Sequence, residues 1–440
     1  MEVKNMYRSR RNRLLFHFLV LFIGKIQGQK MVCGPFLGDL QQKSVQIWVA
    51  SKGADSVDVQ LFDGKLYIKP ENTEYLIQKN KLVSKYYFEN LSPSFKYKVF
   101  VNGAPRQVLN GLDGFMTPND ILGDSDFTFL AASCALVMHR PFGVVFPGAS
   151  RKIFDYMSAE NADFMLWMGD NVYLLPFHFK KEERIFRKNL DVRTKMKPYK
   201  HLIESQVNYA IWDDHDFGPN NGDSQFSGKV STDKIFKAMW PNPRFPEPEN
   251  GRYYSFVYED VEFFMLDNRS NKINEDTSNV YLGEKQLKWL QQSLKDSKAN
   301  FKIIVNGGQI IARFRGTECL RYYKGEFNAL FDFIRHEHIN GVVCMSGDIH
   351  HTELLKDTSL CNYPIYELTS SPMTSMPSKG NPNQPQLVPG TLVDGTRSYA
   401  FIAVTGIGLD RKLVITAKSK KGVVFWQREI ALEAISEQKF

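Results

Sequence analysis

The segment WDDHDFGPNN, residues 212–221, carries four titratable side chains, those of Asp213, Asp214, His215 and Asp216, directly after the apolar run VNYAI. Charged groups at the edge of a core are costly unless they are paired or bind a cation. Two interpretations follow from this cost. The segment is either a solvated acidic loop or part of a metal site.

Polar residues also follow other apolar runs of the chain, at the point where each run stops. In α/β sheets the carboxyl ends of the strands open onto one edge, and ligands bind at that edge. We therefore expect these residues, far apart in sequence, to converge with the 212–221 segment. They are Cys134, Asp170 and Tyr173, Asp267 and Arg269, Asn306 and Gln309, and Asp348, His350 and His351.

The residue types in this set point to metal chemistry. Carboxylate, imidazole, thiolate and tyrosinate groups are all metal ligands, and the set holds more of them than one cation needs. Two cations in one acidic pocket would explain how several carboxylates tolerate one another. Two-metal sites commonly hydrolyse phosphate esters, and a histidine such as His215 can protonate the leaving group.

Each motif taken alone also has a plainer interpretation. Cys134 could be a small core residue, since buried thiols are common. Tyr173 could be a partly buried aromatic residue, and the GD pairs could be simple turns. Asn306 and Gln309 could be ordinary loop amides. The shared sheet edge is what favours a site over these alternatives.

The elements that must position these residues are predicted from residue 127 onward, where strands alternate with helices, the pattern of an α/β domain. The predicted strands include FTFLAASC, DFMLWMGD, VNYAIWDD, VEFFMLDNR, FKIIVNGGQ, GVVCMSGDIHH and PIYELTSSP. Predicted helices are SRKIFDYMSAENA, LGEKQLKWLQQSLKD and GEFNALFDFIRHEH. Leu287, Leu290 and Leu294 give the second helix an apolar stripe.

Residues 31–118 show only β patterns. Short alternating strands such as VQIWVA and YKVFV, with turn signals between them, predict a small sandwich. The segment NDILGDSD reads as a linker. We therefore expect an N-terminal all-β domain over residues 29–120 and a catalytic domain over residues 125–440.

The first 28 residues combine a basic stretch, the short apolar run LLFHFLVLFIG and small or polar residues, which is typical of a secretory signal peptide. An N-terminal membrane anchor is the alternative, although the run is short for a span. Without residues 1–28, which carry six Lys or Arg and one Glu, the net charge of +8 falls to about +3. This weakens the case for nucleic-acid binding. We expect a secreted or periplasmic protein with no stable membrane span after cleavage.

The five cysteines are too few for a disulfide-rich scaffold and show no zinc-finger spacing. Export permits disulfides, so one or two bridges could join Cys33, Cys319, Cys344 and Cys361. At least one thiol must remain free in a chain with five cysteines.

In this order along the chain, the motifs SC, GDNVY, WDDHDFG, LDNR, LGEKQLKWL, SGDIH and YELTSSP resemble those of the PhoD-like alkaline phosphatases. That family belongs to the calcineurin-like metallophosphoesterase superfamily. The N-terminal stretches CGPFLGDLQQKSVQIWVA and FENLSPSFKYKVFVNG resemble its small β-domain. The resemblance implies a four-layer α/β/β/α core with a small N-terminal all-β domain of immunoglobulin or fibronectin type.

The resemblance also implies roles for residues of this chain. Asp170 matches a bridging metal ligand, and Cys134 and Tyr173 match iron ligands. Asp348 and His350 match the ligand pair of the superfamily's GDxH motif. Asp213 and Asp214 are both candidate metal ligands, and Asp214 is the preferred one. His215 matches the acid that assists the leaving group, and Arg269 is a further catalytic candidate. Asn221, or alternatively Asn220, is a candidate calcium ligand.

Family members are exported enzymes that use Fe³⁺ and Ca²⁺, and Zn²⁺ or Mn²⁺ are alternatives here. The implied reaction is hydrolysis of phosphate monoesters or diesters by attack of a metal-bound hydroxide on phosphorus. Small-molecule, lipid or nucleotide-derived phosphate esters are the expected substrates. The Phe-rich segment LLPFHF and the long loop 371–398 raise a first alternative, a phosphodiesterase or a phospholipase-D-like lipid hydrolase. A non-catalytic secreted protein that binds metal or phosphate is a second alternative.

Overall fold

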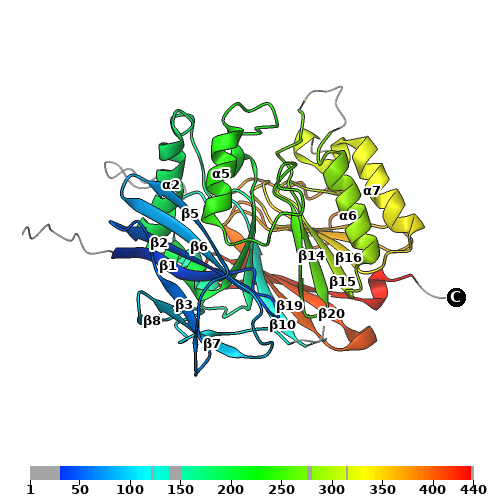
Figure 1. The fold of residues 1–440 in the computed structure, drawn as a ribbon. Helices are drawn as coiled ribbons and strands as arrows, with labels where there is room; N and C mark the ends of the chain where they lie inside the picture. The colour runs from blue at the N-terminus through cyan, green and yellow to red at the C-terminus, as the bar shows by residue number, and fades with distance from the viewer. Residues whose placement is uncertain are drawn as a thin grey trace, which may run out of the picture.

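The computed structural model describes residues 30–119, 123, 125–137, 151–274, 280–313 and 316–437. The predicted signal peptide, residues 1–28, lies outside these residues. The described chain is a mixed α/β fold built around two large sheets, as the alternation of strands and helices predicts (Figure 1).

The larger sheet has ten strands among the described residues. Its centre, from β10 through β11 and β12 to β1, is parallel. In order across the sheet, the strands are β21 (Val424–Ala431), β20 (Lys412–Ser419), β19 (Ser398–Thr405), β10 (Phe127–Ala132), β11 (Phe164–Met168), β12 (Val207–Ile211), β1 (Lys30–Gly38), β2 (Val45–Lys52), β6 (Lys81–Phe88) and β5 (Asn72–Gln78).

The second sheet is parallel from β14 through β15 and β16 to β18, with an antiparallel strand at each edge. Its order is β13 (Tyr254–Tyr258), β14 (Val261–Met265), β15 (Phe301–Val305), β16 (Val342–Ser346), β18 (Ile365–Thr369) and β17 (Glu353–Asp357). A small third sheet contains β4 (Tyr67–Ile68), β3 (Val59–Phe62), β7 (Lys96–Val101), β8 (Ala104–Arg106) and β9 (Phe115–Met116).

Aromatic side chains join the two large sheets. The ring of Phe263 on β14 meets the rings of Phe129 on β10 and Phe164 on β11 edge-on, at 5.3 and 5.4 Å between centroids. The opposite face of the larger sheet packs on helices. There Trp167 on β11 contacts Tyr199 and Trp240 at 5.1 and 5.4 Å between centroids. Parallel strands covered on both faces are apolar throughout, which explains the unbroken apolar runs in the sequence.

The helices lie at the two sides of the molecule (Figure 1), α2 and α5 beside β5 and β6, and α6 and α7 beside β15 and β16. Leu290 and Leu294 of α6 are buried, as their helical spacing predicts. The described α-helices are α1 (Lys152–Ser158), α2 (Glu182–Lys195), α3 (Lys197–Ser205), α4 (Asp214–Phe217), α5 (Lys229–Met239), α6 (Glu284–Asp296) and α7 (Lys324–His336).

The N-terminal region contains strands and no described helix, as predicted, but its strands are shared between two sheets. β1, β2, β6 and β5 continue the larger sheet, because β1 pairs in parallel with β12 through Leu37 and Val207. The side chain of Trp48 on β2 also donates to the carbonyl of Ala238 at the end of α5. The sheet therefore runs across the predicted boundary at residues 120–125.

All five cysteines are free and buried, so the suggested disulfide bridges do not form. Cys319, Cys344 and Cys361 belong to one core cluster and Cys33 to another, yet each thiol stays free. No helix in the described part of the chain is long and apolar enough to cross a membrane.

Candidate metal centre

Several of the predicted site residues meet where strands of both large sheets end. Cys134 follows β10, Asp170 follows β11, Asp214 follows β12 and Asp348 follows β16. Three of these residues, Cys134, Asp170 and Asp348, and also His350, have positive φ angles of 55° to 67°. Non-glycine residues pay about 1–3 kcal/mol for such a backbone. Strain of this kind is concentrated at functional sites, and here it turns the side chains toward one another.

Two glycines beside the site have no room for a side chain. A Cβ atom on Gly347 would lie 2.5 Å from Ser133 Oγ, and one on Gly169 would lie 2.6 Å from Asp213 Cβ. Gly169 also has a φ of +87°, which favours glycine. The glycine of each GD pair therefore lets two strand ends approach closely. This favours the interpretation of the GD pairs as part of a site over that of simple turns.

A first group of potential ligands contains Cys134, Asp170 and His350, each of which offers one ligand atom within 4.8 Å of the others. Cys134 Sγ is 3.5 Å from Asp170 Oδ2. The Tyr173 hydroxyl donates to Asp170 Oδ2 at 2.9 Å and lies 3.2 Å from His350 Nε2. The Ser371 hydroxyl donates to Cys134 Sγ at 3.2 Å. A thiol, a phenol, a carboxylate and an imidazole thus face one small volume.

A second group contains Asp170, Asp214 and His215, again within 4.8 Å. The His215 backbone N–H donates to Asp170 Oδ1 at 3.2 Å, while the His215 ring stacks on Tyr173 at 4.1 Å. Asp214 Oδ2 accepts the backbone N–H of Asn221 at 2.6 Å. Asp170 belongs to both groups, so its carboxylate lies between two potential cation positions.

Burial and crowding of acids dominate the electrostatics. Burial, and then the charges of neighbouring carboxylates, raises the pKa of Asp170 and of Asp348 well above the usual range. Burial followed by the charge of Asp170 also raises the pKa of Cys134 and of Tyr173. Cations would reverse these shifts, because they stabilise the deprotonated forms.

Unpartnered atoms test whether the site fits a metal. The buried oxygens Asp214 Oδ1 and Asp213 Oδ2 and the nitrogen His215 Nδ1 have no hydrogen-bond partner among the described residues. A buried acceptor without a donor is costly. Cations beside Asp214 and Asp170 would satisfy such atoms, so the donor set fits metal ions.

Asp213 has a different environment from Asp214. Its Oδ1 accepts from Asn268 Nδ2 at 2.8 Å and from Arg269 Nε at 2.6 Å. Burial raises its pKa, and the Arg269 charge opposes that shift. One carboxylate oxygen of Asp213 is thus held by the protein.

Arg269, the further catalytic candidate, is fully buried behind Asp213. Its guanidinium also bonds to Glu318 Oε2 at 2.6 Å and to the Gly222 carbonyl at 3.2 Å. Lys272 Nζ bonds to the second Glu318 oxygen at 2.5 Å. Because these contacts occupy its donors, Arg269 is placed to hold Asp213 and the 219–222 loop.

The side chains of the amide candidates make their hydrogen bonds outside the two groups described above. Asn221 is exposed, and its backbone N–H holds Asp214 while its side chain accepts from Asn220. Asn306 is buried and donates to the Tyr281 hydroxyl at 2.9 Å. Gln309 donates to Glu353 at 2.9 Å, in a buried polar network.

Two supporting acids received no role from the sequence. Asp216 accepts the backbone N–H groups of Asn171 and Val172 at 3.1 and 2.9 Å, which fixes the GDNVY turn. Burial raises the Asp216 pKa to about 7. The position of Asp216 in the DDHD motif could have indicated a role in the site. Glu318, which binds Arg269, lies in a segment without a recognisable motif.

Comparisons with known proteins agree with this geometry. A family model for PhoD-like phosphatase matches residues 129–396, more than half of the chain. A solved structure of PhoD superposes with a TM-score of 0.67 at 15% identity, covering 92% of each chain. A purple acid phosphatase from yellow lupin (Lupinus luteus) seeds superposes with a TM-score of 0.65 at 12% identity, covering 90% of this chain and 74% of the other.

No curated protein sequence matches the chain. The family match runs from within β10 to just before β19, and so includes every candidate ligand. The two superpositions show the same fold. On this match the chain belongs to the PhoD-like phosphatase family, and its candidate metal centre supports a metallophosphoesterase.

Proposed function

We propose that this protein is an exported phosphoesterase that hydrolyses phosphate monoesters or diesters with Fe³⁺ and Ca²⁺, or with Zn²⁺ or Mn²⁺ in their place. One observation carries the proposal. The two groups of potential ligands share Asp170, the arrangement that a bridged pair of cations requires. A core of four layers, α/β/β/α, is part of this proposal and is supported by the sheet contacts around Phe263.

The residues divide naturally between two cation positions. Cys134, Tyr173 and His350 would hold one cation. Asp214 would hold the other, with Asp348 as a further acid whose charge interacts most strongly with Asp213 and Asp214. Asp213 has one free oxygen to add, and Asp170 would bridge. The cations would supply charge neutralisation for the phosphate and a lowered pKa for an attacking water.

The protein's own groups orient the reaction. His215 is held by its backbone bond to Asp170 and by its stack on Tyr173. A ring fixed in this way can deliver a proton from a ring nitrogen to the leaving oxygen. Arg269 is proposed as a positioning residue, because its contacts run to Asp213, Glu318 and Gly222.

The first test is phosphate release from an aryl phosphate monoester by the purified protein supplied with iron and calcium, beside Asp170→Asn. We expect the wild type to turn over and the variant to lose about 1,000-fold or more, since a bridging ligand acts in the transition state. Asp332→Asn, which removes an exposed carboxylate on α7, is the matched control. Equal rates for wild type and Asp170→Asn would refute the assignment.

A diesterase or lipid-phosphate hydrolase is the second candidate. Phe177, on the segment that follows Tyr173, is 50% exposed, and Met376, whose backbone contacts His350, is 57% exposed. Exposed apolar residues beside a site favour a substrate with an apolar part. The rate ratio between a bis-aryl phosphate diester and the monoester separates the candidates. A ratio above one favours the second.

A further inference from the structure

A separate open cavity of about 550 Å³ lies at the other end of the central strands. Asp163, which precedes β11, lines this cavity, whereas Asp170 follows the same strand. About 16 Å of strand separates the two positions. The cavity is therefore distinct from the candidate metal centre, and its volume is typical of small-molecule sites.

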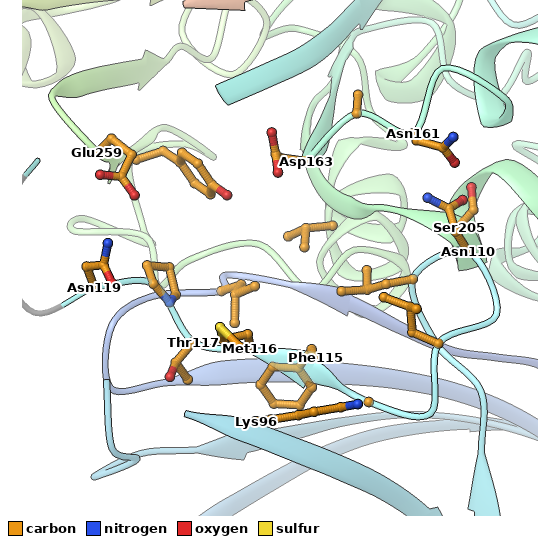
Figure 2. Close-up of a pocket in the computed structure, with 18 residues that line it drawn as sticks. Lys96, Asn110, Phe115, Met116, Thr117, Asn119, Asn161, Asp163, Ser205 and Glu259 are labelled. Atoms are coloured by element: carbon orange, nitrogen blue, oxygen red, sulfur yellow. The ribbon is translucent and has the colours of Figure 1, made fainter. Parts of the chain in front are cut away.

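The cavity has polar groups on its walls and apolar groups at its base. Figure 2 shows Asp163 between two sets of polar side chains, Glu259 with Asn119 on one side and Asn161, Ser205 and Asn110 on the other. Phe115 and Met116 lie below them. Met116 and the neighbouring Leu112 are 61% and 57% exposed, so apolar surface is open to solvent at this cavity.

The charge of the lining is acidic. Asp163 and Glu259 contribute two carboxylates, and Lys96 is the one Lys or Arg among the described lining residues. Lys96 Nζ is already paired with Asp113 Oδ1 at 2.7 Å. The nearby Arg411 bonds to Asp260. No Lys or Arg of the described lining is therefore left to pair with either carboxylate, although the charge of Arg411 acts on Glu259 from outside the lining.

One carboxylate oxygen of Glu259 has no hydrogen-bond donor in the described part of the chain. Its Oε2 atom is buried and has no partner among the described residues. Burial, and then the charge of Asp260, raises its pKa, while the charge of Arg411 and a hydrogen bond with Ser125 oppose that shift. The neighbouring Tyr258 lines the same cavity, and its ring is fixed by Phe127 and Phe164 at 4.9 and 5.0 Å. A donor with positive charge would satisfy Glu259 best.

We infer that this cavity binds an organic cation, an alkylamine whose ammonium group bonds to Glu259 and Asp163 and whose apolar chain packs on Phe115, Met116 and Leu112. Acidic walls disfavour a phosphate or carboxylate ligand. A bare metal ion would leave the apolar surface and most of the volume unfilled. An amine with an alkyl chain uses both parts of the lining.

The test compares three ligands that share a six-carbon chain and differ only in the head group: hexylamine, hexanol and hexanoate. Each is titrated calorimetrically into the whole protein at pH 8. We expect hexylamine to bind about tenfold or more tightly than hexanol, because a charged hydrogen bond is the stronger one, and hexanoate not to bind. Equal affinity for hexylamine and hexanol, or no binding of hexylamine, would overturn the inference.

Variants locate the binding. Glu259→Gln and Asp163→Asn should each weaken hexylamine about tenfold and leave hexanol unchanged. Lys96→Met, which removes the cation of the cavity, should not weaken hexylamine. Because Asp163 also accepts the backbone N–H of Thr128, Glu259→Gln decides the result if Asp163→Asn fails to fold. Unchanged hexylamine affinity in a folded Glu259→Gln protein would refute the site.

Discussion

At the scale of single residues, three aspartates of the same segment differ in role because their hydrogen-bond partners differ. Asp213 and Asp214 are neighbours, yet Asp213 accepts from Arg269 and Asn268 while Asp214 accepts a backbone N–H and keeps one unpartnered oxygen. Asp216, two positions on, caps the Asn171 turn. The local partners, rather than the residue type, decide which carboxylate is available to a cation.

Tyr173→Phe tests the first group of ligands. The change removes the hydroxyl that lies between Asp170 and His350 and leaves the ring that stacks on His215. If that oxygen binds Fe³⁺, the iron-loaded protein absorbs visible light and the variant loses this band. Metal affinity should fall by about 10- to 100-fold. Absorbance during iron titration measures both, with the exposed Tyr75→Phe as control. An unchanged band would contradict the role of Tyr173.

At the scale of elements, buried carboxylates hold chain ends in place. Glu326, in the first turn of α7, accepts the backbone N–H groups of Tyr281, Leu282 and Gly283, just before α6 begins. These donors precede the first turn of α6, so the helix itself offers them no carbonyl partner. One side chain thus ties two helices together.

Glu326→Ala should therefore destabilise the protein by about 2–3 kcal/mol, since three donors lose a charged acceptor. Urea denaturation followed by circular dichroism measures the free energy of unfolding. Glu284→Ala is the matched control in α6. Glu284 is exposed and pairs with Lys288 in an i,i+4 contact, so its loss should leave the free energy of unfolding nearly unchanged. Equal effects of the two variants would contradict the role of Glu326.

Glu367 on β18 gives an element-level pH effect. It is fully buried and accepts the N–H groups of Ile310 and Ile311, and burial raises its pKa from 4.5 to about 7. Between these values the folded state keeps a proton that the unfolded state releases. The free energy of unfolding therefore falls as pH rises from 4.5 to 7, by at most about 3 kcal/mol.

Glu367→Gln removes this titration. The variant should be less stable than the wild type at pH 5, because the glutamine side chain has one acceptor oxygen for the two N–H donors. Its free energy of unfolding should also change less between pH 5 and 7 than that of the wild type. Urea unfolding at both pH values measures the difference. The same pH slope in the variant and the wild type would show that another group titrates.

At the scale of the whole molecule, the N-terminal strands complete the larger sheet. β1 covers the edge of β12, and Gln46 and Trp48 of β2 donate to the carbonyls of Asn242 and Ala238 at and beyond the end of α5. A catalytic unit without these strands would expose the backbone of β12. Exposed strand edges promote aggregation.

A protein of residues 125–440 tests this arrangement. If the shared sheet matters, this fragment should be insoluble or lack cooperative unfolding, whereas the protein of residues 29–440 should unfold cooperatively. Solubility and thermal circular dichroism of the two proteins decide the question. A soluble, cooperatively folded fragment would instead support an independent domain that begins near residue 125.

The sequence predicted the alternation of strands with the helices α1, α6 and α7, because buried parallel strands are apolar throughout and amphipathic helices have a 3.6-residue period. The helices α2, α3 and α5 were not among the predicted elements. Of the residues expected at the strand ends, the structure brings Cys134, Asp170, Asp214, His215 and His350 into the two ligand groups, whereas Asn306 and Gln309 bond elsewhere. The sequence did not predict that β1 joins β12, since β pairing between distant segments leaves no local pattern. The sequence also did not predict the role of Glu318 or that all five thiols are free.

The sequence alone determined the fold class, the family motifs and the residue types that can bind a cation, because these depend on local periodicity and short spacing. The tertiary structure decided that Asp170 lies in both ligand groups, that Arg269 is buried between Asp213 and Glu318, and that a second cavity opens beside Asp163. These features depend on distances between residues far apart in the chain, which only packing can set.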